Sequence, residues 1–251
     1  IYIMIKPMLA YKVDKKPVDW SEKVFMQPKL DGVRCVISKD GAFSRTGKPW
    51  LNIDHILSSL VPVFAEYPDL ILDGELYNHE LKSDFEKIIS LVRKTKPKAT
   101  DRVESCDLVQ FHCYDYIDTS ATFEQRMKFL STAALYSYCV KYVSTFPVAT
   151  RDLANAIHEN WLDEGYEGSI LRLNGVYECK RSYNLQKFKD FHDTEATIVG
   201  YVPGKGKFTG LIGKFLMCDD DGIEFGCPIG KGYNFQDRRD ILNNVKNYVG
   251  K

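Results

Sequence analysis

Lys29 is the first residue whose surroundings suggest chemistry. The stretch "FMQPKLDGVR" (25–34) opens as an apolar run typical of a strand, yet it carries Lys29 where that pattern predicts a buried backbone. A lysine is rarely buried unless it is paired or used. In a cleft, loss of solvation and a neighbouring cation such as Arg34 would both favour its neutral, nucleophilic amine. Asp31 and Gly32 predict a tight turn that lets the backbone approach a ligand. A surface charge at a strand end is the alternative.

Acidic residues on two strands are the next candidates. In "LILDGELYN" (70–78), alternation along an apolar strand puts Asp73 and Glu75 on one face. Carboxylates on a buried strand hold a metal, act as a base or bind a sugar hydroxyl, and structural ion pairing is the alternative. In "DEGYEGSILR" (163–172), Glu167 stands where a helix ends and an apolar strand begins.

Basic residues occur in two further motifs. "SRTGKP" (44–49) puts Arg45 and Lys48 in a turn, which suits a phosphate or carboxylate contact as well as a solvated hairpin tip. "NLQKFKDF" sets Lys187 and Lys189 on the same side of a strand. Two such lysines repel each other unless an anion such as a triphosphate lies between them, although a solvated edge strand also tolerates the pair.

Together these residues are the set expected for covalent capture of a phosphoryl group with the help of a divalent metal. Acids bind the metal, cations neutralise the phosphate charge, and a neutral amine attacks phosphorus in line. The sequence contains no Walker A loop, and "PGKGKFTG" lies in the wrong context for a dinucleotide-binding fingerprint.

The elements that must position these residues alternate irregularly. Apolar runs predict strands near 23–30, 32–38, 69–77, 108–117 and 168–173, and amphipathic stretches predict helices near 54–66, 83–95, 123–138 and 151–164. Thr122 and Thr150 are N-cap signals for the last two helices. This mixture favours an α+β domain over a doubly wound α/β sheet.

The pattern changes after about residue 192. Short β-rich runs are then separated by glycine-rich turns, with "DDDG" as a hairpin tip, and a helix follows at about 235–248. Such a pattern is typical of a small barrel. We therefore expect two domains, 1–192 and 193–251.

Composition limits the function classes. The chain has 34 basic and 34 acidic residues, so its formal net charge is zero. This weakens the case for a nucleic-acid partner but does not exclude one, because a neutral total can hide a basic face. The seven cysteines form no CxxC pair and predict reduced thiols in the cytoplasm. No apolar run approaches the ~20 residues of a membrane span. We expect a monomer, since no apolar stripe is left over for a partner.

Six motifs, in this order and at suitable spacing, resemble the ATP-dependent DNA ligases of the covalent nucleotidyltransferase superfamily: "KLDGVR", "SRTGKP", "DGELY", "YDYID", "EGSILR" and "LQKFKDF". The match begins at "IKPMLA", and "DTEATIVGYVPGKGKFTGLIGKF" is similar to the opening of the ligase OB domain. The resemblance implies an ATP-grasp-like adenylation (nucleotidyltransferase) domain with antiparallel sheets and flanking helices. A small all-β OB-fold domain would follow, lacking its C-terminal end.

The resemblance also implies residue roles. Lys29 would form the phosphoramide bond to AMP. Glu75 would bind ribose or metal, and Glu167 would hold the metal. Lys187 and Lys189 would hold the phosphates, the second also assisting departure of pyrophosphate.

The remaining carried-over roles concern the base and the phosphates. Gln27 sits where the family reads the adenine edge, Tyr114 aligns with the aromatic that stacks on adenine, and Leu30 belongs to the nucleotide-binding residues. An ordinary core aromatic is the alternative for Tyr114. Three arginines would contact the phosphate of the nicked strand or of the nucleotide: Arg34, Arg45 and Arg181.

The implied activity is the sealing of 3′-OH/5′-phosphate nicks in duplex DNA, with ATP and Mg²⁺ or Mn²⁺. The resemblance is to the small viral or bacterial type, which implies the bacterial or virus-infected cytoplasm and association with the nucleoid. The chain stops at "NNVKNYVGK", where family members begin a further basic motif that orients pyrophosphate. Two alternatives remain: RNA end joining or capping by the same lysine chemistry, and a catalytically impaired nucleic-acid-binding relative.

Overall fold

The structure is a computed structural model that describes residues 6–13, 15–133, 137–188, 196–219, 222–230 and 232–251. Contacts divide the chain into two compact units, Ile1–Asp190 and Phe191–Lys251. The domain boundary predicted between 192 and 193 lies outside the described residues and stays a prediction.

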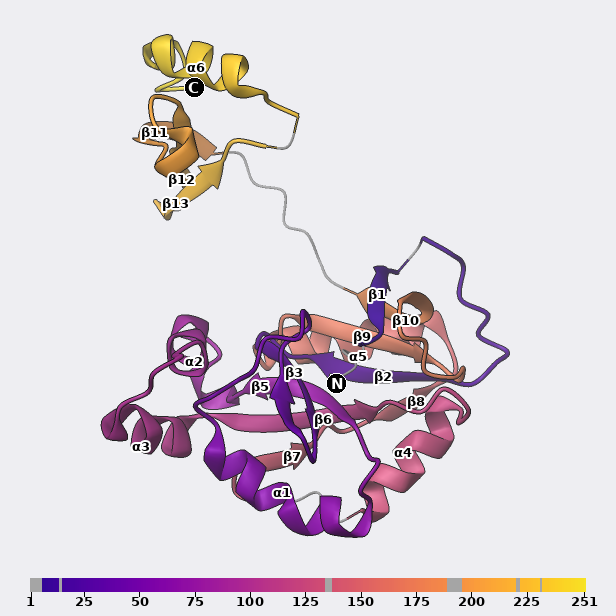
Figure 1. Ribbon diagram of the computed structural model, residues 1–251. Coiled ribbons are helices and arrows are strands. Elements are labelled where there is room, and N and C mark those ends of the chain that lie inside the picture. The colour runs from indigo at the N-terminus through magenta and orange to yellow at the C-terminus, as the bar shows by residue number, and fades with distance from the viewer. Residues whose placement is uncertain (1–5, 14, 134–136, 189–195, 220–221, 231) are drawn as a thin grey trace. The chain divides into compact units, whose positions relative to one another are not determined.

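Two sheets, each of five strands among the described residues, form the frame of the first unit (Figure 1). The first sheet contains, in spatial order, β1 (Leu9–Lys12), β10 (Arg181–Phe188), β9 (Gly168–Leu173), β2 (Val24–Lys29) and β8 (Phe146–Val148). The second contains β4 (Gly41–Phe43), β3 (Val33–Ser38), β5 (Leu72–Tyr77), β6 (Gln110–Tyr116) and β7 (Val140–Tyr142). Two pairs, β1–β10 and β6–β7, are parallel, and the others are antiparallel.

Helices cover one face of each sheet. The helices of this unit are α1 (Asp54–Glu66), α2 (Phe85–Val92), α3 (Ala99–Leu108), α4 (Phe123–Thr132), α5 (Arg151–Asp163) and the 3₁₀-helix η1 (His79–Leu81). Ile56 of α1 and Met127 of α4 are buried in one core with residues of the second sheet such as Leu72, and Figure 1 shows both helices along that sheet. Trp161 of α5 packs with Val24 on the first sheet. No helix of the described residues is long and apolar enough to cross a membrane.

The mixed α and β architecture predicted from the sequence is confirmed. The five predicted strands correspond to β2, β3, β5, β6 and β9, and the four predicted helices to α1, α2, α4 and α5. The helix expected to reach 138 ends at Thr132, and by Ser137 the chain is no longer helical, since its amide donates to the carbonyl oxygen of Val140, the first residue of β7, at 3.0 Å. Helix α3 was not predicted, since Ser105 is its one fully buried residue and it lacks an apolar stripe.

A buried ion cluster joins α4, β6 and β9. Asp115 accepts hydrogen bonds from Arg126 Nε at 2.7 Å and from Arg172 Nη1 at 2.8 Å. Arg126 Nη1 also donates to the carbonyl oxygen of Ala121 at 2.7 Å. The three charged side chains are 0–3% exposed. Such charges are tolerated inside a protein because each is paired and hydrogen-bonded.

The second unit combines strands with the terminal helix that the sequence predicted. Its described strands, β11 (Ala196–Pro203), β12 (Ile212–Asp219) and β13 (Glu224–Pro228), form one antiparallel sheet, accompanied by η2 (Gly206–Phe208), α6 (Phe235–Asn243) and η3 (Val245–Asn247). Asn234 caps α6 by accepting hydrogen bonds from the backbone of Gln236 and Asp237, which explains the helix. Part of the "DDDG" tip, residues 220 and 221, lies outside the described residues. Three described strands are fewer than the five of an OB-fold, so that assignment stays a prediction.

We expect that removing the carboxylate of this ion cluster strongly lowers the free energy of unfolding. Asp115→Ala leaves Arg126 and Arg172 buried without their anion, so the free energy of unfolding should fall by about 3–5 kcal/mol in urea denaturation. Glu124→Ala is the control, since it removes only the exposed pair with Lys23 (49% and 61% exposed) and should cost less than about 1 kcal/mol. Equal losses in the two variants would contradict this account of the cluster.

Candidate active site

A cavity of about 270 Å³ is lined by strands of both sheets of the first unit. Its lining comes from β1, β2, β9 and β10 of the first sheet and from β3, β5 and β6 of the second. Eight of the predicted site residues line it: Gln27, Lys29, Leu30, Arg34, Arg45, Glu75, Tyr114 and Lys187. Sequence positions far apart in the chain therefore meet in one chamber.

Lys29 forms an ion pair with Glu167. Strands β2 and β9 pair so that Lys29 lies opposite Gly168, and the amide of Glu167 donates to the carbonyl oxygen of Lys29 at 3.2 Å. Both side chains are about one-fifth exposed (23% and 20%). Arg34, the cation expected near Lys29, lines the same cavity but forms its own ion pair with Asp73. The strand register brings a carboxylate to the amine instead, while Arg34 has another partner.

The end of α5 explains where Glu167 lies. Gly165 has φ +89° and its amide donates to the carbonyl oxygen of Leu162, while the amide of Tyr166 donates to that of Trp161, both at 2.9 Å. These two bonds form a Schellman motif, which requires a left-handed residue that glycine adopts without strain. The chain leaves the motif directly into β9, so Glu167 stands at the strand start that the sequence predicted.

Arg34 pairs with Asp73 behind the cavity. Its Nε and Nη2 donate to the two carboxylate oxygens at 2.6 Å each, and Nη2 also donates to the carbonyl oxygen of Met8 at 3.0 Å. The hydroxyl of Tyr177 donates to Asp73 as well, at 2.6 Å. Burial lowers the pKa of Arg34, but Asp73, Tyr114 and Tyr177 together outweigh burial and raise that pKa well above its usual value. For Asp73, the structural ion pair is therefore the correct alternative.

Glu75 lies across β3–β5 from Arg34 and faces the cavity. Burial raises its pKa to about 7, although Arg34 and Lys29 act in the opposite direction. Tyr114 donates its hydroxyl to Glu75 at 3.3 Å, and burial raises the pKa of this phenol well above its usual value. The guanidinium groups of Arg34 and Arg172 lie 5.3 and 5.4 Å from the centre of the Tyr114 ring.

Gln27 is held by the protein itself. Its Nε2 donates to the carbonyl oxygen of Tyr114 at 3.0 Å and to Thr145 Oγ1 at 2.9 Å, and its Oε1 accepts from Arg172 Nε at 2.9 Å. A contact of Gln27 with an adenine edge would therefore use an amide that already bonds to these three residues.

Gly32 was predicted to let the backbone approach a ligand, and here it lets the backbone of the second sheet approach closely. A Cβ there would lie 2.5 Å from the carbonyl oxygen of Leu76.

The remaining predicted residues divide into three groups. Lys187 lines the cavity from β10, and Arg45 reaches its edge from an exposed turn. Arg181 is not among the cavity-lining residues; it is exposed, and its guanidinium donates to the carbonyl oxygen of Ala10. Lys189 lies outside the described residues. Sequence reasoning missed Arg172, although a charged residue inside the apolar run of "EGSILR" was the available signal.

Two carboxylates are the available metal ligands: Glu75 lines the cavity, and Glu167 pairs with the cavity-lining Lys29. Among the described residues, no group of three or more His, Cys, Asp or Glu side chains could hold a metal ion. Mg²⁺ commonly uses only one or two protein carboxylates and takes its other ligands from substrate phosphates and water. Glu75 and Glu167 therefore fit a metal that is bound together with a nucleotide.

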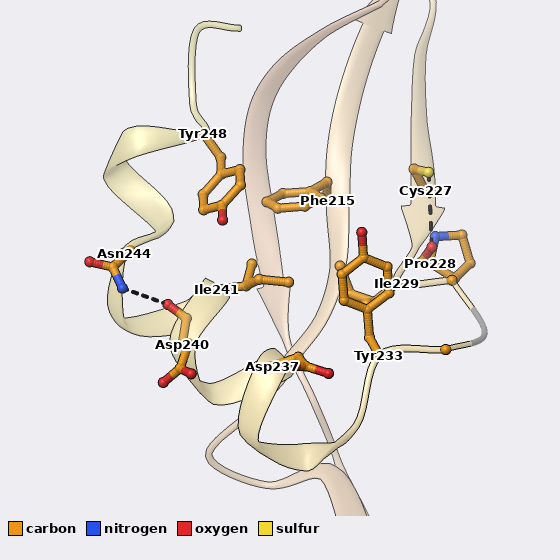
Figure 2. Close-up of a pocket in the computed structure, with 12 residues that line it drawn as sticks. Phe215, Cys227, Pro228, Ile229, Tyr233, Asp237, Asp240, Ile241, Asn244 and Tyr248 are labelled. Atoms are coloured by element: carbon orange, nitrogen blue, oxygen red, sulfur yellow. Dashed lines mark hydrogen bonds between the residues drawn. The ribbon is translucent and has the colours of Figure 1, made fainter.

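The second unit has a cavity of a different character, of about 610 Å³ (Figure 2). Asp237, Asp240 and Asn244 of α6 and its end lie on one side, and Phe215 and Tyr248 face each other with ring centres 5.7 Å apart. None of the predicted site residues lines it, and its described lining is acidic without a basic residue. Such a lining does not suit a phosphate.

The pKa of Glu75 predicts a pH effect on stability. A folded-state pKa of about 7 exceeds the usual 4.5, so the neutral acid stabilises the fold at low pH, and this contribution is lost as pH rises through about 7. Between about pH 5 and pH 8, wild type should lose about 1–3 kcal/mol more stability than Glu75→Gln, measured by urea denaturation. Identical pH profiles would show that Glu75 titrates normally.

Comparison with known proteins agrees with this geometry. The family model of the ATP dependent DNA ligase domain matches residues 7–189. DNA ligase of Enterobacteria phage T4 is 26% identical over 301 residues, covering 97% of this chain and 62% of the phage protein. DNA ligase of Haemophilus influenzae is 25% identical over 235 residues, covering 92% of this chain and 80% of that protein.

A solved structure extends the match to three dimensions. The structure of a Lig E DNA ligase, reported for DNA binding with a minimal scaffold, has a TM-score of 0.72 at 25% identity and covers 95% of this chain and 88% of that one. This chain spans 62% of the length of the phage T4 ligase that it matches. Because the family model takes in most of the first unit and more than half of the sequence, the chain belongs to the ATP-dependent DNA ligase domain family.

Proposed function

We propose that this protein seals 3′-OH/5′-phosphate nicks in duplex DNA, with ATP as the source of AMP and Lys29 as its covalent carrier. One observation carries the proposal. A lysine, a carboxylate, a second lysine and an aromatic ring, all at positions that match the family motifs, line one cavity between two sheets, and a second carboxylate, Glu167, pairs with Lys29. We further propose that the protein acts as a monomer in the cytoplasm.

The first step would form a bond between Lys29 Nζ and the α-phosphorus of ATP. The bond from that phosphorus to the leaving pyrophosphate breaks, and the amine releases its proton to water. Because attack needs the neutral amine, the ion pair of Lys29 with Glu167 has to open as the nucleotide reacts. Transfer of AMP to a 5′-phosphate and its displacement by a 3′-hydroxyl complete the reaction.

The cavity walls would supply the nucleotide contacts. Lys187, together with Lys189, would neutralise the phosphates, and the Tyr114 ring would stack on the base. Gln27 would contact the adenine edge and Leu30 would pack beside the nucleotide. Arg181 would contact the phosphate of the nicked strand from outside the cavity.

A divalent metal would be held by Glu75 and Glu167. Mg²⁺ or Mn²⁺ would lower the negative charge that the amine meets at the phosphates. Since burial raises the pKa of Glu75 to about 7, its carboxylate would be available to a cation mainly above neutral pH, or once the cation itself lowers that pKa.

A basic groove beside the cavity suits the DNA strand. A second cavity, of about 850 Å³, shares Arg34, Arg45 and Glu75 with the first. Its lining contains five basic residues and one acidic residue: Arg34, Arg45, Lys48, Arg93, Lys94 and Glu75. We propose that the phosphodiester backbone next to the nick lies in this groove, where the cations contact its phosphates.

Lys29→Arg should abolish labelling of the polypeptide by α-labelled ATP and Mg²⁺. Arginine keeps the charge but stays protonated, so it cannot attack phosphorus. Lys23→Arg is the matched control, because Lys23 is an exposed lysine of the same unit that pairs with Glu124, and this variant should label like wild type. Label that persists in Lys29→Arg would assign the acceptor to another residue.

Lys48→Ala combined with Arg93→Ala should weaken binding to nicked duplex DNA and reduce the slope of log K against log salt by about 1–2. Lys39→Ala combined with Lys128→Ala removes the same charge from exposed positions that do not line the groove, and it should leave the slope almost unchanged. The affinity is measured by fluorescence anisotropy at several salt concentrations. Equal slopes for both double variants would rule out this path for the strand.

A further inference from the structure

A small packed cluster lies directly beside the Lys29–Glu167 pair. Leu30, which follows Lys29, is buried in it together with Tyr77 and Val143. Tyr166, which precedes Glu167, packs against the same cluster. Lys29 and Glu167 are thus each one residue away from a shared apolar contact.

His79 connects the cluster to the turn that carries Glu167. It lies in η1, just after β5 of the second sheet, and shares a hydrogen bond of 2.6 Å with the hydroxyl of Tyr77. On its other side its ring stacks on Tyr166, with ring centres 4.4 Å apart and an interplanar angle of 30°. Tyr166 precedes β9 of the first sheet, so this stack joins the two sheets.

Lys82 makes a second contact between the same two segments. Its Nζ donates to the carbonyl oxygen of Glu164 at 2.6 Å, within the Schellman motif that ends α5. A Cβ on Gly165 would lie 2.8 Å from the Lys82 side chain, so the glycine also leaves room for this lysine. Residues 79–82 therefore contact two of the three residues that precede Glu167.

We propose that His79 is a positioning residue that holds the 164–167 turn against the second sheet and so fixes the Glu167 carboxylate at Lys29. The side chain of His79 contacts Tyr77 on one side and Tyr166 on the other, and it acts on Glu167 only through the backbone of the turn. Lys82 supports the same arrangement. Without His79, the turn keeps only the packing of Tyr166 on the cluster and the Lys82 contact, and Glu167 samples more positions.

Hydrogen exchange tests this positioning without any ligand. An aromatic stack and a hydrogen bond are each worth about 0.5–1.5 kcal/mol, so His79→Ala should speed exchange of the Tyr166 and Glu167 amides about tenfold. His79→Phe keeps the stack and should recover most of the protection. His55→Ala is the control, since His55 is a partly buried histidine whose ring bonds the carbonyl oxygen of Val109 instead, and it should leave these amides unchanged.

A second readout rests on the proposed function. His79→Ala should raise the Mg²⁺ concentration for half-maximal lysyl-AMP formation about threefold to tenfold, with the KM for ATP within about twofold of wild type. His79→Phe should restore the metal response. If wild type forms no lysyl-AMP, the proposed function is wrong. The hydrogen-exchange experiment needs no ligand, so it still tests whether His79 positions the turn.

Two results would overturn the positioning role. Unchanged exchange at Tyr166 and Glu167 in His79→Ala would show that the stack does not hold the turn. An equal rise in exchange across β6 and the turn would show that His79 contributes only to overall stability.

Discussion

Lys29 and Glu167 meet because β2 and β9 pair antiparallel with Lys29 opposite Gly168. Side chains alternate along a strand, so a slip of one residue would turn Lys29 away from the second sheet. The packing on the two faces prevents such a slip. Val24, Met26 and Leu171 are buried against α5 on one face, whereas Phe25 packs into the core of the second sheet on the other. The register that fixes the reactive pair is thus specified by apolar residues on both sides.

Two buried carboxylates form the wall behind the cavity. Asp73 holds Arg34, and Asp115 holds Arg126 and Arg172, so that Tyr114 lies between two fixed guanidinium groups. Arg172 also fixes the amide of Gln27, which joins β9 to β2 and β6. Ion pairs of this kind contribute little net stability relative to apolar packing, but breaking one is costly. Their effect here is to orient the side chains that face the cavity before any ligand binds.

The sequence predicted the site better than the contacts behind it. Lys29 and Glu75 could be singled out because each interrupts an apolar strand pattern with a charge that needs a partner or a use, and Glu167 because it stands directly before such a strand. Partners could not be predicted, because Asp115 and Arg172 are 57 positions apart and only the strand order brings them together. The same limit explains why Arg34 was expected beside Lys29, although it bonds Asp73 along the neighbouring strand. Helix α3 and the short strands β4, β7 and β8 could not be predicted, because their sequences carry no periodic apolar pattern and tertiary packing determines their conformation.

Nick sealing is the most direct test of the central claim that Lys29 carries AMP to DNA. Wild-type protein is incubated with ATP, Mg²⁺ and a duplex that carries one labelled nick, and ligated strand is resolved on a denaturing gel. Wild type and Lys29→Arg are each tested on this nick and on one already bearing AMP at its 5′-phosphate. The account predicts sealing by wild type with ATP, and sealing by Lys29→Arg only of the adenylated nick. Sealing of the plain nick by Lys29→Arg, or failure of wild type on both nicks, would contradict it.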